Sequence, residues 1–123
     1  MIFDGVAATV DFEVALSDDT IGPLTLQCRR PTYAEQLRDM GHATASYFAD
    51  DPATERQRQA EDRLRAVVVG WAGVVNAAGE PVPFDWTRFM AACGRYPAVL
   101  GLAVDAANRA FAGASVDELA KKN

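Results

Sequence analysis

Apolar and polar residues alternate near the start of the chain. Every second residue is apolar across 9–16, and the same alternation returns across 24–28, which is typical of half-buried β-strands. The segment 17–23 between them is rich in Ser, Asp, Gly and Pro, the residues that favour turns. We therefore predict an antiparallel β-hairpin over residues 8–30. Since a lone hairpin is marginally stable, its apolar face must pack on helices or pair with another chain.

Beyond the hairpin, apolar residues recur with the spacing of helices. Thr32 and Ser115 each stand three residues before a glutamate, which is the capping-box pattern of a helix start. Asp51 and Asp85 are further N-cap residues. The predicted helices span 33–48, about 52–78, 86–94 and 97–113, with a short tail helix after Ser115.

The predicted helix over 52–78 changes character halfway. Its first half alternates in charge, and the pairs Arg58–Asp62 and Glu61–Arg65 have the i,i+4 spacing of helical ion pairs. This half is expected to be a solvated face.

The second half of the same segment is apolar. Gly70 and Gly73 interrupt it, and because an interior glycine destabilises a helix by about 1 kcal/mol, we expect close packing of a neighbouring element there. One expected stripe consists of Leu64, Val67, Val68, Trp71, Val74 and Val75.

These elements define an α+β fold that is predominantly helical, with an N-terminal antiparallel β-hairpin packed against four or five helices. A chain of 123 residues fits one domain, 1–123. Within it we assign 8–30 to the hairpin, 32–113 to a helical core and 114–123 to a short tail helix and polar end.

Composition narrows the classes of function. The net charge of −5 disfavours nucleic-acid binding, which depends on clustered Lys and Arg. The longest uncharged stretch, 66–79, is too short to span a membrane, and the first residues lack the basic start of a secretory signal. We expect a cytoplasmic protein whose partners are proteins.

Candidate catalytic chemistry is sparse. His42 is the only histidine; Asp39 lies one turn before it, and Asp50 and Asp51 follow on the same segment. Metal sites need three or four convergent ligands, whereas these carboxylates are already explained by capping and solubility. We therefore predict no enzyme, no cofactor and no metal, with a His42-dependent metal enzyme as a minor alternative.

Other residues that carry chemistry have a structural interpretation. Trp71 and Trp86 have the spacing of core residues, and Cys28 and Cys93 are interpreted as small buried hydrophobes because neither belongs to a Cys-x-x-Cys pair. The glycines form no phosphate-binding motif.

Three landmarks resemble the small tail assembly chaperones of long-tailed bacteriophages and prophages. They are the run Leu-Thr-Leu-Gln-Cys-Arg-Arg-Pro-Thr-Tyr-Ala-Glu at 24–35, the run Val-Gly-Trp-Ala-Gly-Val-Val-Asn-Ala-Ala-Gly-Glu-Pro-Val-Pro-Phe at 69–84, and the Tyr96-Pro97 break between two helices. The resemblance covers most of the chain and is one of pattern.

The resemblance implies a helper that binds the aggregation-prone tape-measure protein and tail-tube subunits without entering the finished particle. An exposed hairpin edge offers hydrogen bonds to a partner strand, and we place the partner-binding residues at Thr25, Gln27 and Arg29. Homo-oligomerisation through the same edge is a further expectation. The alternative within this class is a head–tail connector or another subunit of the virion.

Overall fold

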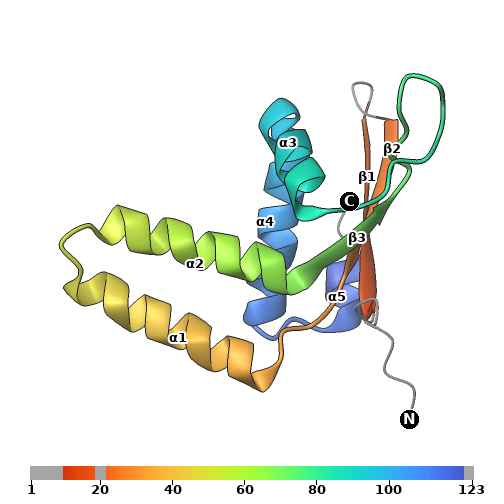
Figure 1. Cartoon of the computed structure of the whole chain (residues 1–123). Helices are drawn as coiled ribbons and strands as arrows, with labels where there is room; N and C mark the ends of the chain where they lie inside the picture. The colour runs from red at the N-terminus through yellow and green to blue at the C-terminus, as the bar shows by residue number, and fades with distance from the viewer. Residues whose placement is uncertain (1–9, 19–21, 121–123) are drawn as a thin grey trace, which may run out of the picture.

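A three-stranded antiparallel sheet and five helices form the part of the chain that the structure, a computed structural model, describes: residues 10–18 and 22–120. The predicted α+β, mainly helical fold is confirmed (Figure 1). In chain order the elements are β1 (Phe12–Asp18), β2 (Gly22–Cys28), α1 (Tyr33–Phe48), α2 (Pro52–Val67), β3 (Val68–Ala72), α3 (Trp86–Arg95), α4 (Pro97–Phe111) and α5 (Val116–Ala120).

The sheet has the order β1-β2-β3, so β2 is its central strand. β1 and β2 form the predicted hairpin, with Val14 opposite Leu26. The third strand corrects the prediction of one helix over 52–78, because α2 ends at Val67 and β3 pairs with β2. Consecutive β-branched valines favour an extended backbone, and pairing with β2 satisfies their backbone groups. The predicted helical core at 32–113 therefore contains a strand.

Gly70 and Gly73 allow β3 and the residue after it to lie close to β2, rather than allowing two helices to pack closely. A Cβ on Gly70 would displace the end of the Gln27 side chain, whose Oε1 lies over the glycine from the neighbouring strand. Gly73 has a φ of +88°, and a Cβ there would lie 2.6 Å from the carbonyl oxygen of Pro23. Close approach was the correct reason for these glycines, although the neighbour is a strand.

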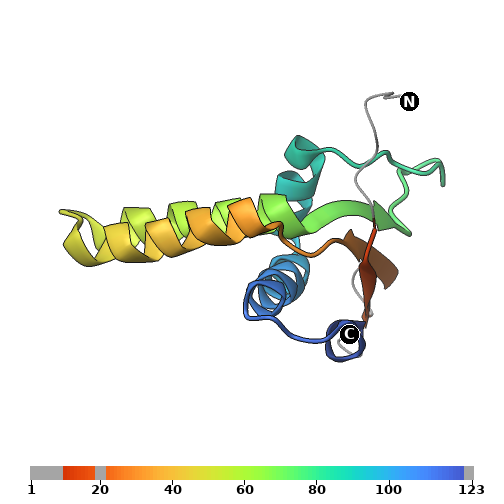
Figure 2. The ribbon, with the colours of Figure 1, turned by 90° about the horizontal axis from the view of Figure 1, so that it is seen from below.

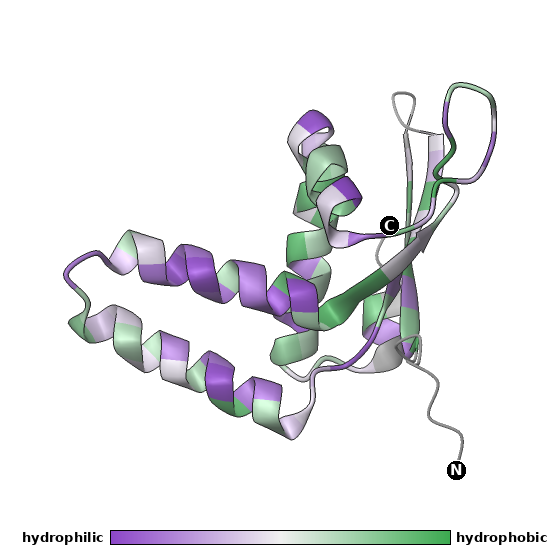
Figure 3. Ribbon diagram, in the orientation of Figure 1, coloured by the Kyte–Doolittle hydropathy of each residue, from purple (hydrophilic) through white to green (hydrophobic). Residues whose placement is uncertain are grey.

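One face of the sheet packs against the C-terminal helices to form the core. Phe89 of α3 is fully buried there, and α4 supplies a row of small residues. Figure 3 shows the hydrophobic start of β3 entering this core. The core cluster consists of Phe12, Val14, Leu24, Leu26, Cys28, Leu64, Val67, Val68, Phe89, Cys93, Val99, Leu102, Ala103, Ala106, Ala107, Ala110 and Leu119.

The aromatic residues predicted for the core lie at its border. Trp71 and Trp86 are half-buried and pack against the cluster through Phe84 and Phe89. The Trp71 indole N–H donates to the carbonyl of Val82 at 2.8 Å. This bond fastens the loop between β3 and α3 to the end of the sheet.

Helices α1 and α2 form an antiparallel hairpin that projects from the rest of the molecule, and we call it the arm (Figures 1 and 2). The C-terminal end of α2 is anchored in the core by Leu64 and Val67, whereas α1 has no buried residue. Along its length α1 packs mainly on α2.

The predicted helix starts are confirmed. Thr32 and Glu35 form a reciprocal capping box, and Asp51 and Asp85 each accept a hydrogen bond from the first turn of their helix. Ser115 caps α5 in the same way as Thr32 caps α1. Among the described residues, no helix is both long and apolar enough to cross a bilayer.

Candidate functional site

The two helices of the arm meet through charged and polar side chains. Asp39 of α1 receives two hydrogen bonds from the guanidinium of Arg63 on α2, with Nε to Oδ1 at 2.7 Å and Nη2 to Oδ2 at 2.8 Å. Gln59 adds a third donor, 3.1 Å from Oδ1. Arg63 in turn reaches Asn108 of α4 at 3.0 Å, so this contact ties the arm to the rest of the molecule.

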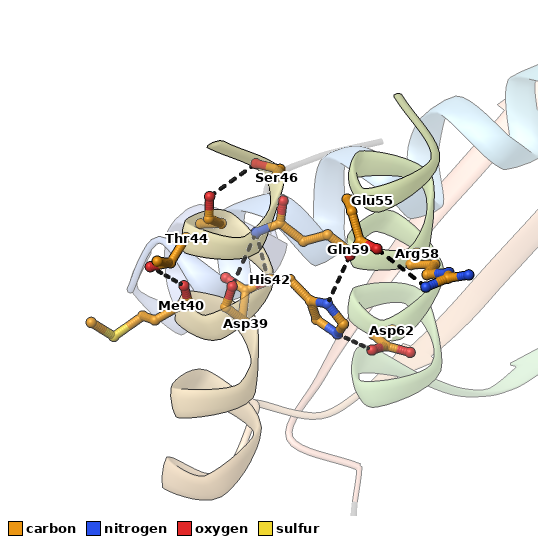
Figure 4. Close-up of polar contacts among 10 residues, drawn as sticks. Asp39, Met40, His42, Thr44, Ser46, Glu55, Arg58, Gln59 and Asp62 are labelled. Carbon is orange, nitrogen blue, oxygen red and sulfur yellow. Dashed lines mark hydrogen bonds and ion pairs between the residues drawn. The ribbon is translucent and has the colours of Figure 1, made fainter. Parts of the chain in front are cut away.

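A second contact lies nearer the free end of the arm. His42 Nε2 is 2.6 Å from Oδ2 of Asp62, and its Nδ1 is 4.0 Å from Glu55 (Figure 4). The predicted Arg58–Asp62 pair does not form, because Asp62 faces His42 and Arg58 contacts Glu55 instead. Asp62, which was predicted to lie on a solvated face of α2, therefore contacts α1 instead.

The base of α1 is held by Arg29. Its guanidinium contacts both carboxylate oxygens of Glu35, at 2.8 and 2.5 Å, while Glu35 also accepts from the backbone N–H of Thr32. Burial alone would raise the pKa of Glu35, but hydrogen bonds from Arg29 and Thr32 outweigh it and lower that pKa. Arg29, predicted as a partner-binding residue, is thus engaged within the chain.

The same balance acts at the centre of the contact between the helices. Burial alone would raise the pKa of Asp39, but the hydrogen bonds from Arg63 and Gln59 and the positive charge of Arg63 lower it. The hydrogen bond to Asp39 correspondingly raises the pKa of Arg63. Both groups stay charged over the ordinary pH range, so electrostatics hold the arm together.

The opposite face of α1 is apolar and open to solvent. In Figure 4, Met40 points away from α2 while His42 points toward it. Residues spaced by three, four, seven or eleven positions share one side of a helix. The large apolar residues of α1 do so, with Tyr33, Leu37, Met40 and Tyr47 separated by four, three and seven positions and Phe48 lying eleven positions after Leu37. The exposed fractions are 76% for Tyr33, 49% for Leu37, 65% for Met40, 88% for Tyr47 and 83% for Phe48. We call these five residues the outer stripe.

Helix α1 is therefore inverted relative to an ordinary surface helix, whose apolar stripe faces the core. Its polar residues Glu35, Asp39 and His42 face its own chain through the contacts described above. Arg38 lines the same groove between the helices. Clusters of exposed large apolar side chains mark interaction sites in soluble proteins, which makes the outer stripe the best candidate for a functional surface.

Thr25 and Gln27, the predicted partner-binding residues on β2, are not part of the outer stripe. Thr25 pairs with Ala15 on one side and Ala72 on the other, and Gln27 is likewise flanked by β1 and β3. The expectation that this strand offers an open edge is wrong, because β3 covers it. The half-buried side chains of Thr25 and Gln27 still lie on the sheet face opposite the core, so a side-chain role for them stays a prediction.

The histidine, aspartates and cysteines that were weighed as catalytic or metal-binding residues do not come together in one site. Asp39 is taken by Arg63 and His42 by Asp62, and no group of three or more metal-ligating side chains is found in residues 10–18 and 22–120. Burial raises the pKa of Cys28 to about 12 and that of Cys93 to about 11, so both thiols are protonated and unreactive at neutral pH.

The sequence alone reveals that the outer stripe has helical spacing, but not that these residues face solvent. The spacing 33, 37, 40, 47 and 48 was visible, but the same period predicts burial in most helices. No family model, curated protein or solved structure matches the chain.

Proposed function

We propose that this chain is a non-enzymatic assembly chaperone of long-tailed bacteriophages or prophages, which binds the tape-measure protein and tail-tube subunits. The observation that carries the proposal is the inverted helix α1, whose five large apolar residues face solvent. An amphipathic helix displayed in this way is suited to contact apolar segments of another helical protein. The pattern resemblance of 24–35 and 69–84 supplies the identity of the partner.

The geometry of the arm supports a holding role. The outer stripe lies on a projecting element, so a long partner can contact it without meeting the rest of the molecule (Figures 1 and 2). A contact confined to one helix face is smaller than the interfaces of permanent complexes. Binding is accordingly reversible, as a helper absent from the finished particle requires.

Co-expression with the long tape-measure protein that the proposal expects to be encoded near this gene tests the proposal, and the lack of any such neighbouring gene would count against it. The measurement is the soluble fraction of the tape-measure protein, with and without the chain. We expect the wild-type chain to raise that fraction and Leu37→Glu, which places a charge in the outer stripe, to lower it. Ala60→Glu adds the same charge at an exposed position of α2 and serves as the matched control.

Two results would count against the proposal. A tape-measure protein that is equally soluble without the chain would remove the chaperone role. Stoichiometric amounts of the chain in purified virions, measured by mass spectrometry, would favour the alternative of a head–tail connector or other virion subunit.

A further inference from the structure

We propose that the outer stripe of the free protein is covered by a second copy of this chain, with the two α1 helices packed antiparallel about a two-fold axis at Met40. The proposal goes beyond the chaperone function and does not depend on it. It starts from the exposure of Met40 and its neighbours on a helix that carries no buried residue. Three further observations identify the second copy as the occupant.

The first observation is the placement of two tyrosines at equal distances before and after Met40. Tyr33 lies seven positions before Met40 and Tyr47 lies seven positions after it. In an antiparallel pair centred on Met40, Tyr33 of one copy meets Tyr47 of the other, and the same contact occurs twice. An isologous interface requires this self-complementarity. Aromatic pairs are among the stronger contacts between helices.

The second observation is the symmetry of charge about the same residue. Arg30 lies ten positions before Met40 and Asp50 lies ten positions after it, and neither side chain takes part in the Arg29–Glu35 pair or the Asp51 cap. Antiparallel pairing therefore brings the acidic end of each arm to the basic end of the other. A parallel pair would place aspartates against aspartates and arginines against arginines, which repel.

The helix dipoles add to this preference. The last turn of α1 contains no basic residue, so the partial negative charge of its C-terminus is not compensated within the helix. In the antiparallel pair, that end lies beside the N-terminus of the second α1 and its preceding arginines. The arrangement places positive charge beside the C-terminus of each α1, whose N-terminus is already capped by Thr32 and Glu35.

The third observation is Gly41, beside Met40 in the middle of α1. A Cβ built on Gly41 would meet nothing within 4 Å, so packing within the chain does not require a glycine there. Glycine inside a helix destabilises it by roughly 1 kcal/mol relative to alanine. Close approach of a second helix at the axis gives this glycine a physical reason.

Sedimentation velocity of the purified full-length chain tests the association. We expect a dimer that dissociates on dilution and weakens with added salt, because a single helix face buries little area and the end contacts are screened. Met40→Glu, which places two carboxylates at the axis, should yield a monomer at all concentrations with unchanged helicity. Ala60→Glu, on α2, should dimerise like the wild type. A monomeric wild type, or a dimer that survives Met40→Glu, would overturn the proposal.

Charge reversal tests the pairing of the ends. Arg30→Asp alone should weaken the dimer, and Arg30→Asp combined with Asp50→Arg should restore it. Both positions suit the test because neither side chain is needed for the caps, which use Thr32 and Asp51. A double variant as weak as the single one would contradict the antiparallel arrangement.

Cysteine cross-linking tests the register directly. A mixture of Tyr33→Cys and Tyr47→Cys proteins should form a disulfide-linked dimer under mild oxidation, and each variant alone should form little. Met40→Cys alone should cross-link to itself. The native thiols Cys28 and Cys93 are buried and should contribute no background. Efficient cross-linking of Tyr33→Cys alone would indicate a parallel pair and refute the model.

Discussion

Asp39 on α1 and Arg63 on α2 form a two-point ion pair, and Gln59 and the His42–Asp62 contact add further polar links between the same helices. The Asp39 side chain is 13% exposed and that of Arg63 is 26% exposed, so water screens the pair only partly. An ordinary helical hairpin is held together by an apolar core between its helices. Since α1 has no buried residue, we expect this ion pair to supply much of the free energy that holds α1 against α2.

Removing the charge of Asp39 should loosen α1 without unfolding the rest of the chain. We expect Asp39→Asn to lower the free energy of α1 opening by about 1–2 kcal/mol, the scale of hydrogen bonds to charged groups with a discount for solvent. Native-state hydrogen exchange of the α1 amides measures it. Arg58→Ala is the control, because its pair with Glu55 is 65% exposed on the arginine side and should change exchange little. Equal effects of both variants would contradict the assigned role.

Acid should release the arm. The pKa of Asp39 is lowered in the folded chain, so its stabilising contribution is fully present above the ordinary value of 3.8 and is lost as pH falls below it. Far-ultraviolet ellipticity should therefore show loss of helix on acidification through this range. Asp39→Asn should show a smaller loss, because that contribution is already absent. A variant that titrates like the wild type would assign the transition to other carboxylates.

Local signals in the sequence predicted where the helices begin. The main error, one helix predicted over 52–78, arose because β3 depends on pairing with a strand far away in the sequence. The caps at Thr32, Asp51 and Asp85 depend on residues three positions away, so the sequence displays them directly. β3 depends on β2, which lies some forty positions earlier, and a short apolar run has no periodicity that separates strand from buried helix. The consecutive valines before Gly70 were the available signal.

The candidate site was harder to predict for a different reason. A helical apolar stripe can be identified from the sequence, but whether it faces the core depends on how the chain folds back on itself. His42 was weighed as a base or ligand, whereas the structure uses it to contact Asp62 between helices. The predicted edge at Thr25 is occupied by β3, so a proline there should disrupt the sheet rather than test partner binding.

Alanine substitutions at Gly73 and Gly79 distinguish the cost of backbone strain from the cost of steric collision. Both have positive φ, but a Cβ on Gly73 meets the Pro23 carbonyl whereas one on Gly79 meets open space. Gly79→Ala should cost about 1 kcal/mol from strain alone, and Gly73→Ala should cost more because the backbone must also shift. Urea unfolding measures both. Equal losses would mean that the loop after β3 adjusts freely.

Two leucines on α4 give a matched test of the core. Leu102 is buried at 8% exposure, and Leu100 is 37% exposed. Leu102→Ala should lower the free energy of unfolding by about 2–5 kcal/mol, and Leu100→Ala by about 1 kcal/mol or less. Similar losses at the two positions would contradict the described orientation of α4.

The two proposals together predict that self-association competes with partner capture. If the outer stripe is covered by a second copy in the free protein, only the dissociated fraction binds the tape-measure protein, and the apparent affinity is reduced by that fraction. Arg30→Asp, which weakens the dimer but leaves the outer stripe intact, should therefore keep the tape-measure protein soluble at a lower chain concentration than the wild type. Met40→Glu should lose both activities, because Met40 belongs to the outer stripe. If Arg30→Asp requires a higher concentration than the wild type, the dimer itself is the binding form, and the competition model is wrong while self-association stands.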